Sequence, residues 1–154
     1  MGKPKSYSHD SMILLESMTQ SILITTAELN SPGPFIVYVN NAFEKMTGWR
    51  REEIIGKNPR ILQGPKSDLS IFYNLREVLD NGEAWEGKTI NYKKDGTEFF
   101  MEWSINQVFN KNGRVESLIA VQHDITEIVR TEKQLEKSRE RERKRIAEIK
   151  QASL

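Results

Sequence analysis

Five stretches of the chain have the composition or the two-residue alternation of β-strands. The first two, residues 22–26 and 35–39, are rich in β-branched side chains and are separated by turn-forming residues. The other three, residues 85–92, 98–108 and 114–123, are joined by the hairpin signals Asp95-Gly96 and Asn112-Gly113. This order predicts an α+β fold with a five-stranded antiparallel sheet and short helices on one face.

The helical patterns lie before and between these strands. Phe43, Met46 and Trp49 keep helical spacing, and Gly48 suits the end of that helix. A second and clearer pattern predicts one helix from Asp68 to Leu79. A short helix, capped at Asp10-Ser11 and running to about Met18, is expected within an N-terminal flank of residues 1–19.

Alternation along the last strands predicts which residues face the interior. Phe99, Met101 and Trp103 share one face, and Leu118, Ala120 and Gln122 share another. Gln122 is thus a polar residue at the end of a small apolar row. It is either an amide that meets solvent at a strand end or an amide that faces a ligand.

The amino-acid composition argues against several classes of function. The net charge is +1 with both signs spread along the chain, so nucleic acid is not an expected partner. The chain has no cysteine and only two histidines, which excludes thiol catalysis and a histidine-rich metal centre and fits a reducing, cytoplasmic location. Its apolar runs are too short to span a membrane. No acid–base or nucleophile constellation appears, so an enzyme is not expected, and neither catalytic nor metal-binding residues are assigned.

The character of the sequence changes after Asp124. Residues 125–154 form a charged segment without glycine or proline, in which five apolar residues fit a heptad seam: Ile125, Ile128, Leu135, Ile146 and Ile149. Arg139 and Glu142 occupy the core positions between Leu135 and Ile146. The segment is either a solvated single helix or a two-stranded coiled coil that is weak in its middle, and the second interpretation predicts a homodimer through the flanking helices.

The most informative stretch is Gly56-Lys57-Asn58-Pro59-Arg60-Ile61-Leu62-Gln63. Proline is tolerated in the first turn of a helix, and it keeps the preceding asparagine out of the α-helical conformation. Two amides and a guanidinium beside an apolar wall would suit a flat heterocycle that carries a phosphate. A capped helical turn on the surface is the alternative interpretation.

Together these motifs resemble the PAS superfamily, and specifically its flavin-binding light-oxygen-voltage (LOV) branch, over about residues 20–127. The resemblance rests on the stretch from Gly56, on its spacing to the following helix, and on four further segments: Ile36–Phe43, Thr47-Gly48-Trp49, Asn91–Thr97 and Val121–Thr126. It assigns residues 20–124 to a PAS/LOV sensor domain and residues 125–154 to a linker toward an effector such as a kinase or cyclase.

The resemblance also implies a binding site for FMN, with FAD as the alternative. Asn58 and Gln63 would lie along the ribityl chain, and Arg60 and Arg76 would pair with the phosphate. Asn91 would bond the pyrimidine edge. Gln122 would reach the O4/N5 edge of the flavin, where an amide can reverse donor and acceptor.

Two positions depart from the family pattern. Pro59 stands where photoactive LOV domains have the cysteine that forms an adduct with the flavin, so no adduct is expected. Met101 stands where a further asparagine normally meets the ring, and it would pack on the flavin or in the core together with Leu62.

Three functional hypotheses follow. The first is a blue-light sensor that signals through photoreduction of FMN to the neutral semiquinone, with an electron from one of five aromatic residues: Trp49, Trp85, Trp103, Tyr38 or Tyr92. Gln122 would then reorient and pass the change to the C-terminal helix. The second is a redox or oxygen sensor that uses FAD or FMN in the dark, suggested by the Asn58–Leu62 run, Trp85 and Glu102. The third is a PAS module that binds no ligand and only dimerises.

Overall fold

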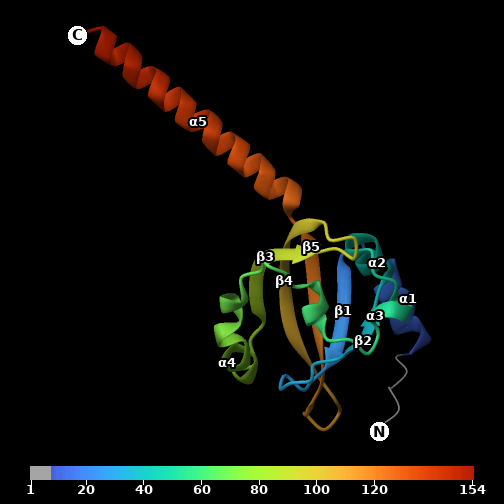
Figure 1. Cartoon of the computed structure of the whole chain (residues 1–154). Coiled ribbons are helices and arrows are strands. Elements are labelled where there is room, and N and C mark those ends of the chain that lie inside the picture. The colour runs from blue at the N-terminus through green and yellow to red at the C-terminus, as the bar shows by residue number, and fades with distance from the viewer. Residues whose placement is uncertain (1–7) are drawn as a thin grey trace. The chain divides into compact units, whose positions relative to one another are not determined.

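The computed structural model describes residues 8–154 and contains one five-stranded antiparallel sheet (Figure 1). The strands lie in the order β2-β1-β5-β4-β3. Their bounds are β1 Ser21–Thr26, β2 Ile36–Val39, β3 Trp85–Tyr92, β4 Glu98–Phe109 and β5 Val115–Asp124. The predicted α+β fold with a five-stranded sheet is confirmed.

Helical segments between β2 and β3 cover one face of the sheet. They are α2 (Asn41–Thr47), α3 (Arg51–Ile54), the 3-10 helices η1 (Pro59–Leu62) and η2 (Leu69–Asn74), and α4 (Leu75–Asp80). Gly48 has φ 77° and ends α2, and its backbone N–H bonds the carbonyl oxygen of Glu44, as the sequence predicted.

The main core lies between these helical segments and the sheet. Phe99, Met101 and Trp103 of β4 and Leu118 and Ala120 of β5 are all buried in it. The registers Ile105↔Ala120 and Trp103↔Gln122 place the inward rows of the two strands side by side. The prediction of inward faces from alternation is confirmed.

The segment between Asp68 and Leu79 differs from the predicted single helix. It forms η2 and then α4, and Leu69 is 57% exposed. Two side-chain contacts tie this segment to β3: Thr89 Oγ1 accepts from the Asp68 N–H at 2.7 Å, and Asn74 Oδ1 accepts from Trp85 Nε1 at 3.2 Å. These tertiary bonds and the local Asp68–Ser70 bonds compete with a regular α-helix.

Helix α1 (His9–Ser17) packs on the other face of the sheet. Met12 and Leu15 contact a second apolar cluster formed by Ile22, Ile24 and Tyr38. Because Leu23 belongs to the main core while its neighbours Ile22 and Ile24 belong to this cluster, β1 is covered on both faces.

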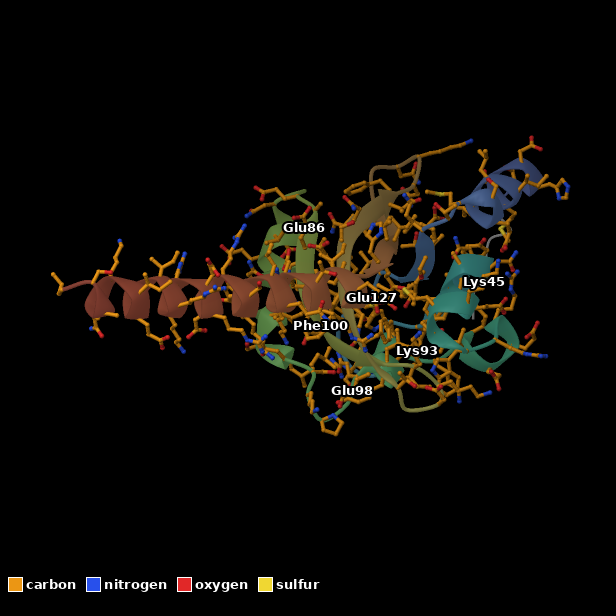
Figure 2. All side chains as sticks on the ribbon, turned by 90° about the horizontal axis from the view of Figure 1, so that it is seen from above. Lys45, Glu86, Lys93, Glu98, Phe100 and Glu127 are labelled. Carbon is orange, nitrogen blue, oxygen red and sulfur yellow. The ribbon has the colours of Figure 1, made fainter. Side chains whose placement is uncertain are left out.

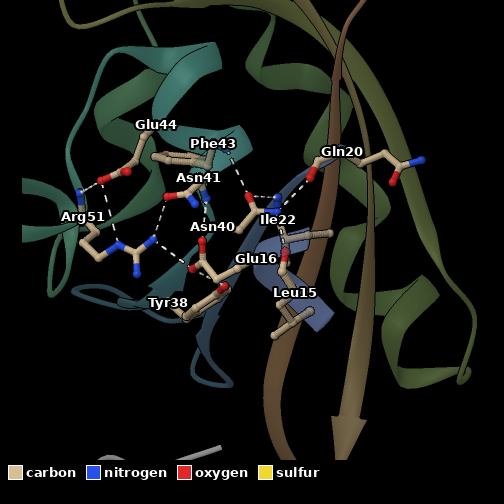
Figure 3. A network of polar contacts seen from close by, with 10 residues as sticks. All are labelled: Leu15, Glu16, Gln20, Ile22, Tyr38, Asn40, Asn41, Phe43, Glu44 and Arg51. Carbon is tan, nitrogen blue, oxygen red and sulfur yellow. Dashed lines mark hydrogen bonds and ion pairs between the residues drawn. The ribbon is translucent and has the colours of Figure 1, made fainter. Parts of the chain in front are cut away.

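A polar network adds to the packing of α1 (Figure 3). Glu16 Oε1 accepts from Tyr38 Oη at 2.7 Å and from Arg51 Nη2 at 2.9 Å. Burial opposes ionisation of Glu16, but these bonds outweigh it and hold the pKa of the carboxyl below its usual range. Burial and the bond to Glu16 raise the pKa of Tyr38.

The β3–β4 hairpin closes at the turn predicted from Asp95-Gly96. Lys93 and Glu98 flank it (Figure 2). Lys93 Nζ lies 5.7 Å from the centroid of the Phe99 ring. Lys94 Nζ forms an ion pair with Glu53 of α3. This ion pair connects the turn of the hairpin to the helical layer.

Residues 125–154 form a separate unit that consists mainly of α5 (Thr126–Ala152). Side chains project from all sides of this helix (Figure 2). The apolar residues of the proposed seam in this helix are half-exposed, from 44% at Ile146 to 57% at Ile128 and Ile149. No helix within residues 8–154 is long and apolar enough to cross a membrane.

Candidate functional site

A cavity of about 540 Å³ lies between the sheet and its helical cover. Its walls are mainly apolar and include Leu23 of β1, Met101 and Trp103 of β4, and Leu118 and Ala120 of β5. Its volume falls within the range of about 300–1,000 Å³ that is typical of small-molecule sites. The cavity is large enough for a tricyclic ligand.

All nine residues singled out from the sequence line this cavity: Asn58, Pro59, Arg60, Leu62, Gln63, Arg76, Asn91, Met101 and Gln122. They come from η1 and the residues on either side of it, from α4 and from three different strands. The structure therefore brings together amides and guanidinium groups that lie up to 64 positions apart in the chain, from Asn58 to Gln122.

The Asn58 amide is committed to the protein. Its Oδ1 accepts from the Arg60 N–H at 2.9 Å and thus caps η1. Its Nδ2 donates to the carbonyl oxygens of Pro32 at 3.1 Å and Gly33 at 3.0 Å. Asn58 thereby holds the 30–34 turn beside the cavity, and this leaves its amide few bonds to offer a ligand.

Pro59 occupies the first turn of η1, where the sequence placed it. Its side chain lines the cavity, and the proline ring contains no thiol. Gly64 follows this helix, and a Cβ there would lie 2.3 Å from the Tyr92 ring. The turn after η1 therefore requires glycine.

The buried Asn91 amide is placed between Met101 and the backbone. In one orientation Nδ2 lies 3.6 Å from Met101 Sδ. In the reverse orientation it donates to the carbonyl oxygens of Leu62 at 3.3 Å and Ile90 at 3.2 Å. Carbonyl oxygens are stronger acceptors than a thioether, so the second orientation is favoured, and it presents the Oδ1 acceptor on the Met101 side.

Gln122 is 4% exposed, and its Oε1 accepts from Ser21 Oγ at 3.0 Å. Its Nε2 has no hydrogen-bond partner within the described part of the chain. A buried amide that lines a cavity with its donor unused is suited to bind a ligand acceptor. The structure thus excludes an amide that only meets solvent.

Two arginines line the cavity and keep exposed side chains. Arg60 lies in η1, and Arg76 lies in α4 with its Nη2 donating to Asn30 Oδ1 at 2.8 Å. Two guanidinium groups on one cavity favour an anionic ligand such as a phosphate. The described residues include no group of three acidic or histidine side chains that could hold a metal ion.

The five aromatic residues considered as electron donors occupy different environments. Trp103 lines the cavity, and its ring centroid lies 5.5 Å from that of Trp85 behind it. Tyr38 bonds Glu16 on the other face of the sheet, and Tyr92 Oη accepts from the Lys66 N–H. Of these five residues, only Trp103 lines the cavity.

Sequence reasoning missed part of the cavity wall. Leu23 and Thr25 of β1 line it, as do Phe72 and Leu75. The alternation Ser21-Leu23-Thr25 along β1 would have placed three residues on the cavity face. Phe72 and Leu75 lie within the segment that was predicted only as a helix from Asp68 to Leu79.

Comparisons with known proteins agree with this architecture. A model of the PAS domain family matches residues 20–127. Blue-light-activated histidine kinase 1 of Erythrobacter litoralis is 34% identical over 128 residues, which are 82% of this chain and 36% of that protein. Phototropin-2 of Oryza sativa subsp. japonica is 30% identical over 112 residues, 73% of this chain and 12% of that protein.

Solved structures give the same result. An RNA-binding light-oxygen-voltage receptor superimposes with a TM-score of 0.72 at 28% identity, covering 93% of this chain and 42% of that one. A light-oxygen-voltage domain studied with a flavin analogue gives 0.68 at 27% identity, covering 86% and 97%.

The fold is that of a sensory domain. The chain belongs to the PAS domain family, and within it to the LOV branch. It spans only 12% and 36% of the two curated relatives, so it corresponds to one part of each.

Proposed function

We propose that this chain is a blue-light or redox sensory module that binds FMN without a covalent bond. The observation that carries this proposal is the cavity lined by the Gln122 amide, whose donor is unused, by Asn91, and by Arg60 and Arg76. An apolar slot with amides on its walls and guanidinium groups beside it has the chemistry of a flat heterocycle joined to a phosphate. The family membership and the names of the relatives support the same ligand class and blue light as the signal.

Each cavity residue has a distinct part in this proposal. Arg60 and Arg76 hold the phosphate, and Gln63 lies along the ribityl chain. Asn91 and Gln122 bond the polar edges of the ring, and Leu62 and Met101 pack against its faces. Asn58 acts mainly by shaping η1 and the 30–34 turn.

A bound flavin supplies absorption of blue light and reversible one-electron reduction. Because Pro59 has no thiol, signalling depends on photoreduction rather than on a cysteinyl adduct. Trp103 is the proposed electron donor, and the centroid of the Trp85 ring lies 5.5 Å from that of Trp103, with the two rings tilted by 58°. Reorientation of the Gln122 amide alters β5, and the change reaches α5 through the short connection at Ile125.

The output is proposed to be a dimer that carries an effector domain. The half-exposed seam of Ile128, Leu135, Ile146 and Ile149 would pair two copies of α5. Relatives named histidine kinases suggest a kinase as the effector. The dark redox sensor gains no support from Glu102, which is exposed and absent from the cavity wall.

The proposal is tested directly by a substitution that fills the cavity. Ala120→Leu adds three carbon atoms to a buried wall residue, and we expect the folded protein to lose FMN. Ala27→Leu makes the same change at a half-buried alanine that does not line the cavity and should keep FMN. Equal FMN retention by the two variants would place the ligand elsewhere.

A further inference from the structure

Ser21 is a buried polar residue at the start of β1 with no assigned role. It lies directly opposite Gln122 in the β1–β5 register, and both residues are almost fully buried, at 3% and 4% exposure. Side chains that are directly opposite on neighbouring strands share a face of the sheet. Ser21 Oγ therefore meets the Gln122 amide and donates to Oε1 at 3.0 Å.

This bond determines which end of the Gln122 amide faces the cavity. With Oε1 occupied by the Ser21 hydroxyl, the Nε2 donors have no partner within residues 8–154. An amide carries its donor and acceptor on opposite sides. The Ser21 bond thus leaves the N–H end available to a ligand.

The backbone on both sides of Ser21 is fixed by Asn40, which is 0% exposed. Asn40 Nδ2 donates to the carbonyl oxygen of Gln20 at 2.9 Å, and its Oδ1 accepts from the Ile22 N–H at 2.9 Å. Figure 3 shows Asn40 between these two residues. The Ser21 hydroxyl consequently has little freedom to leave Gln122.

We propose that Ser21 is the positioning residue that sets the donor–acceptor polarity of Gln122 toward the bound ligand. A hydroxyl can donate one bond or accept two. When a ligand edge changes from acceptor to donor by gaining a proton, Gln122 can turn, and Ser21 can then accept from Nε2. Ser21 and Gln122 thus keep a hydrogen bond to each other in both orientations of the amide. This inference rests on the proposed flavin site.

The first test measures the hydrogen bond to the flavin in the FMN-loaded chain. A hydrogen bond lowers the stretching frequency of a carbonyl, so Ser21→Ala should shift the flavin C=O band to higher frequency in the infrared spectrum. Ser21→Thr, which keeps the hydroxyl, should restore the band. Ser117→Ala removes another buried hydroxyl from the far end of the same β1–β5 ladder and should leave the band unchanged.

An unshifted band in Ser21→Ala, or an equal shift in Ser117→Ala, would overturn the proposal. Gln122→Leu gives the reference for complete loss of the bond. Rescue by Ser21→Thr separates positioning from general destabilisation, because a purely structural effect on folding would not track the hydroxyl.

The second test uses ligand-free chain and is independent of flavin binding. In ¹⁵N NMR spectra, Ser21→Ala should move the side-chain amide resonances of Gln122, whereas Ser117→Ala should not. Unmoved resonances would refute the Ser21–Gln122 pair even in a chain that binds FMN. A chain that refuses FMN but shows the shift would refute the flavin site and leave the positioning contact established.

Discussion

At the scale of single residues, Asn40 holds three elements together. Its Oδ1 accepts from the Ile22 and Phe43 N–H groups, and its Nδ2 donates to the carbonyl oxygens of Leu15 and Gln20. These bonds join β1, the start of α2 and the end of α1. A single buried amide thus satisfies four backbone groups.

Asn40→Ala should therefore cost about 3–5 kcal/mol of unfolding free energy, since each of its four buried hydrogen bonds, one of which caps α2, contributes about 1 kcal/mol. Urea denaturation measures this loss. Asn41→Ala alters the neighbouring exposed asparagine and should cost under about 1 kcal/mol. Similar losses for both variants would contradict the role assigned to Asn40.

The arginines of the cavity make a second residue-scale prediction. Wild-type chain should bind FMN more tightly than riboflavin, because charge-assisted bonds contribute about 1.5–3 kcal/mol each. Arg60→Ala combined with Arg76→Ala should remove this preference in a fluorescence titration. Arg114→Ala changes an exposed arginine away from the cavity and should preserve it. A preference that survives the double variant would place the phosphate elsewhere.

At the scale of elements, the attachment of α1 depends on pH. Glu16 has a folded-state pKa below 4.5, so its ionisation stabilises the fold above that pH. The contribution is lost as the pH falls from about 4.5 through the lower folded-state pKa. Stability should decline on the acid side for this reason.

Glu16→Gln should flatten this acid limb when unfolding free energy is measured between pH 3 and pH 7, a range set by the usual pKa of carboxyl groups. Glu52→Gln replaces an exposed carboxylate of α3 and should leave the limb intact. An acid limb unchanged by Glu16→Gln would show that the network in Figure 3 does not titrate as described.

A second prediction at this scale is that two copies of the chain dimerise through helix α5. Leu135 lies at the centre of the seam and is 50% exposed in the single chain. Leu135→Lys should reduce dimer formation by more than tenfold in sedimentation experiments, because a core position of a coiled coil then holds a charge. Gln134→Lys adds the same charge outside the seam and should have little effect. A wild-type chain that stays monomeric at all concentrations would favour the solvated single helix.

Local sequence patterns predicted most of the secondary-structure elements, because strand residues alternate between apolar and polar and helix residues keep helical spacing. The bounds of β3 match the sequence prediction at both ends, and the end of α2 at Gly48 was also predicted correctly. The 68–80 region was not, because its form depends on bonds to Thr89 and Trp85, which lie in a strand further along the chain. Side-chain contacts to distant strands are not encoded in local periodicity.

At the scale of the whole molecule, the sequence indicated the residues of the cavity but not their mutual contacts. All nine candidates line one cavity. They could be named from the sequence because each occupies a position that matches a motif of the LOV branch. That the Asn58 amide is committed to Pro32 and Gly33, and that Gln122 is held by Ser21, required coordinates. These pairs join residues 25 or more positions apart, and no local pattern records them.

The central claim is that the cavity holds a flavin which responds to light without forming an adduct. The most direct measurement is the absorption spectrum of FMN-treated chain and of Pro59→Cys, before and after blue light under mild reductant. We expect a structured flavin band in both, photoreduction without an adduct in the wild type, and reversible adduct formation only in Pro59→Cys. A colourless chain that refuses FMN would contradict the flavin site, and a loaded Pro59→Cys variant without an adduct would contradict the position assigned to Pro59.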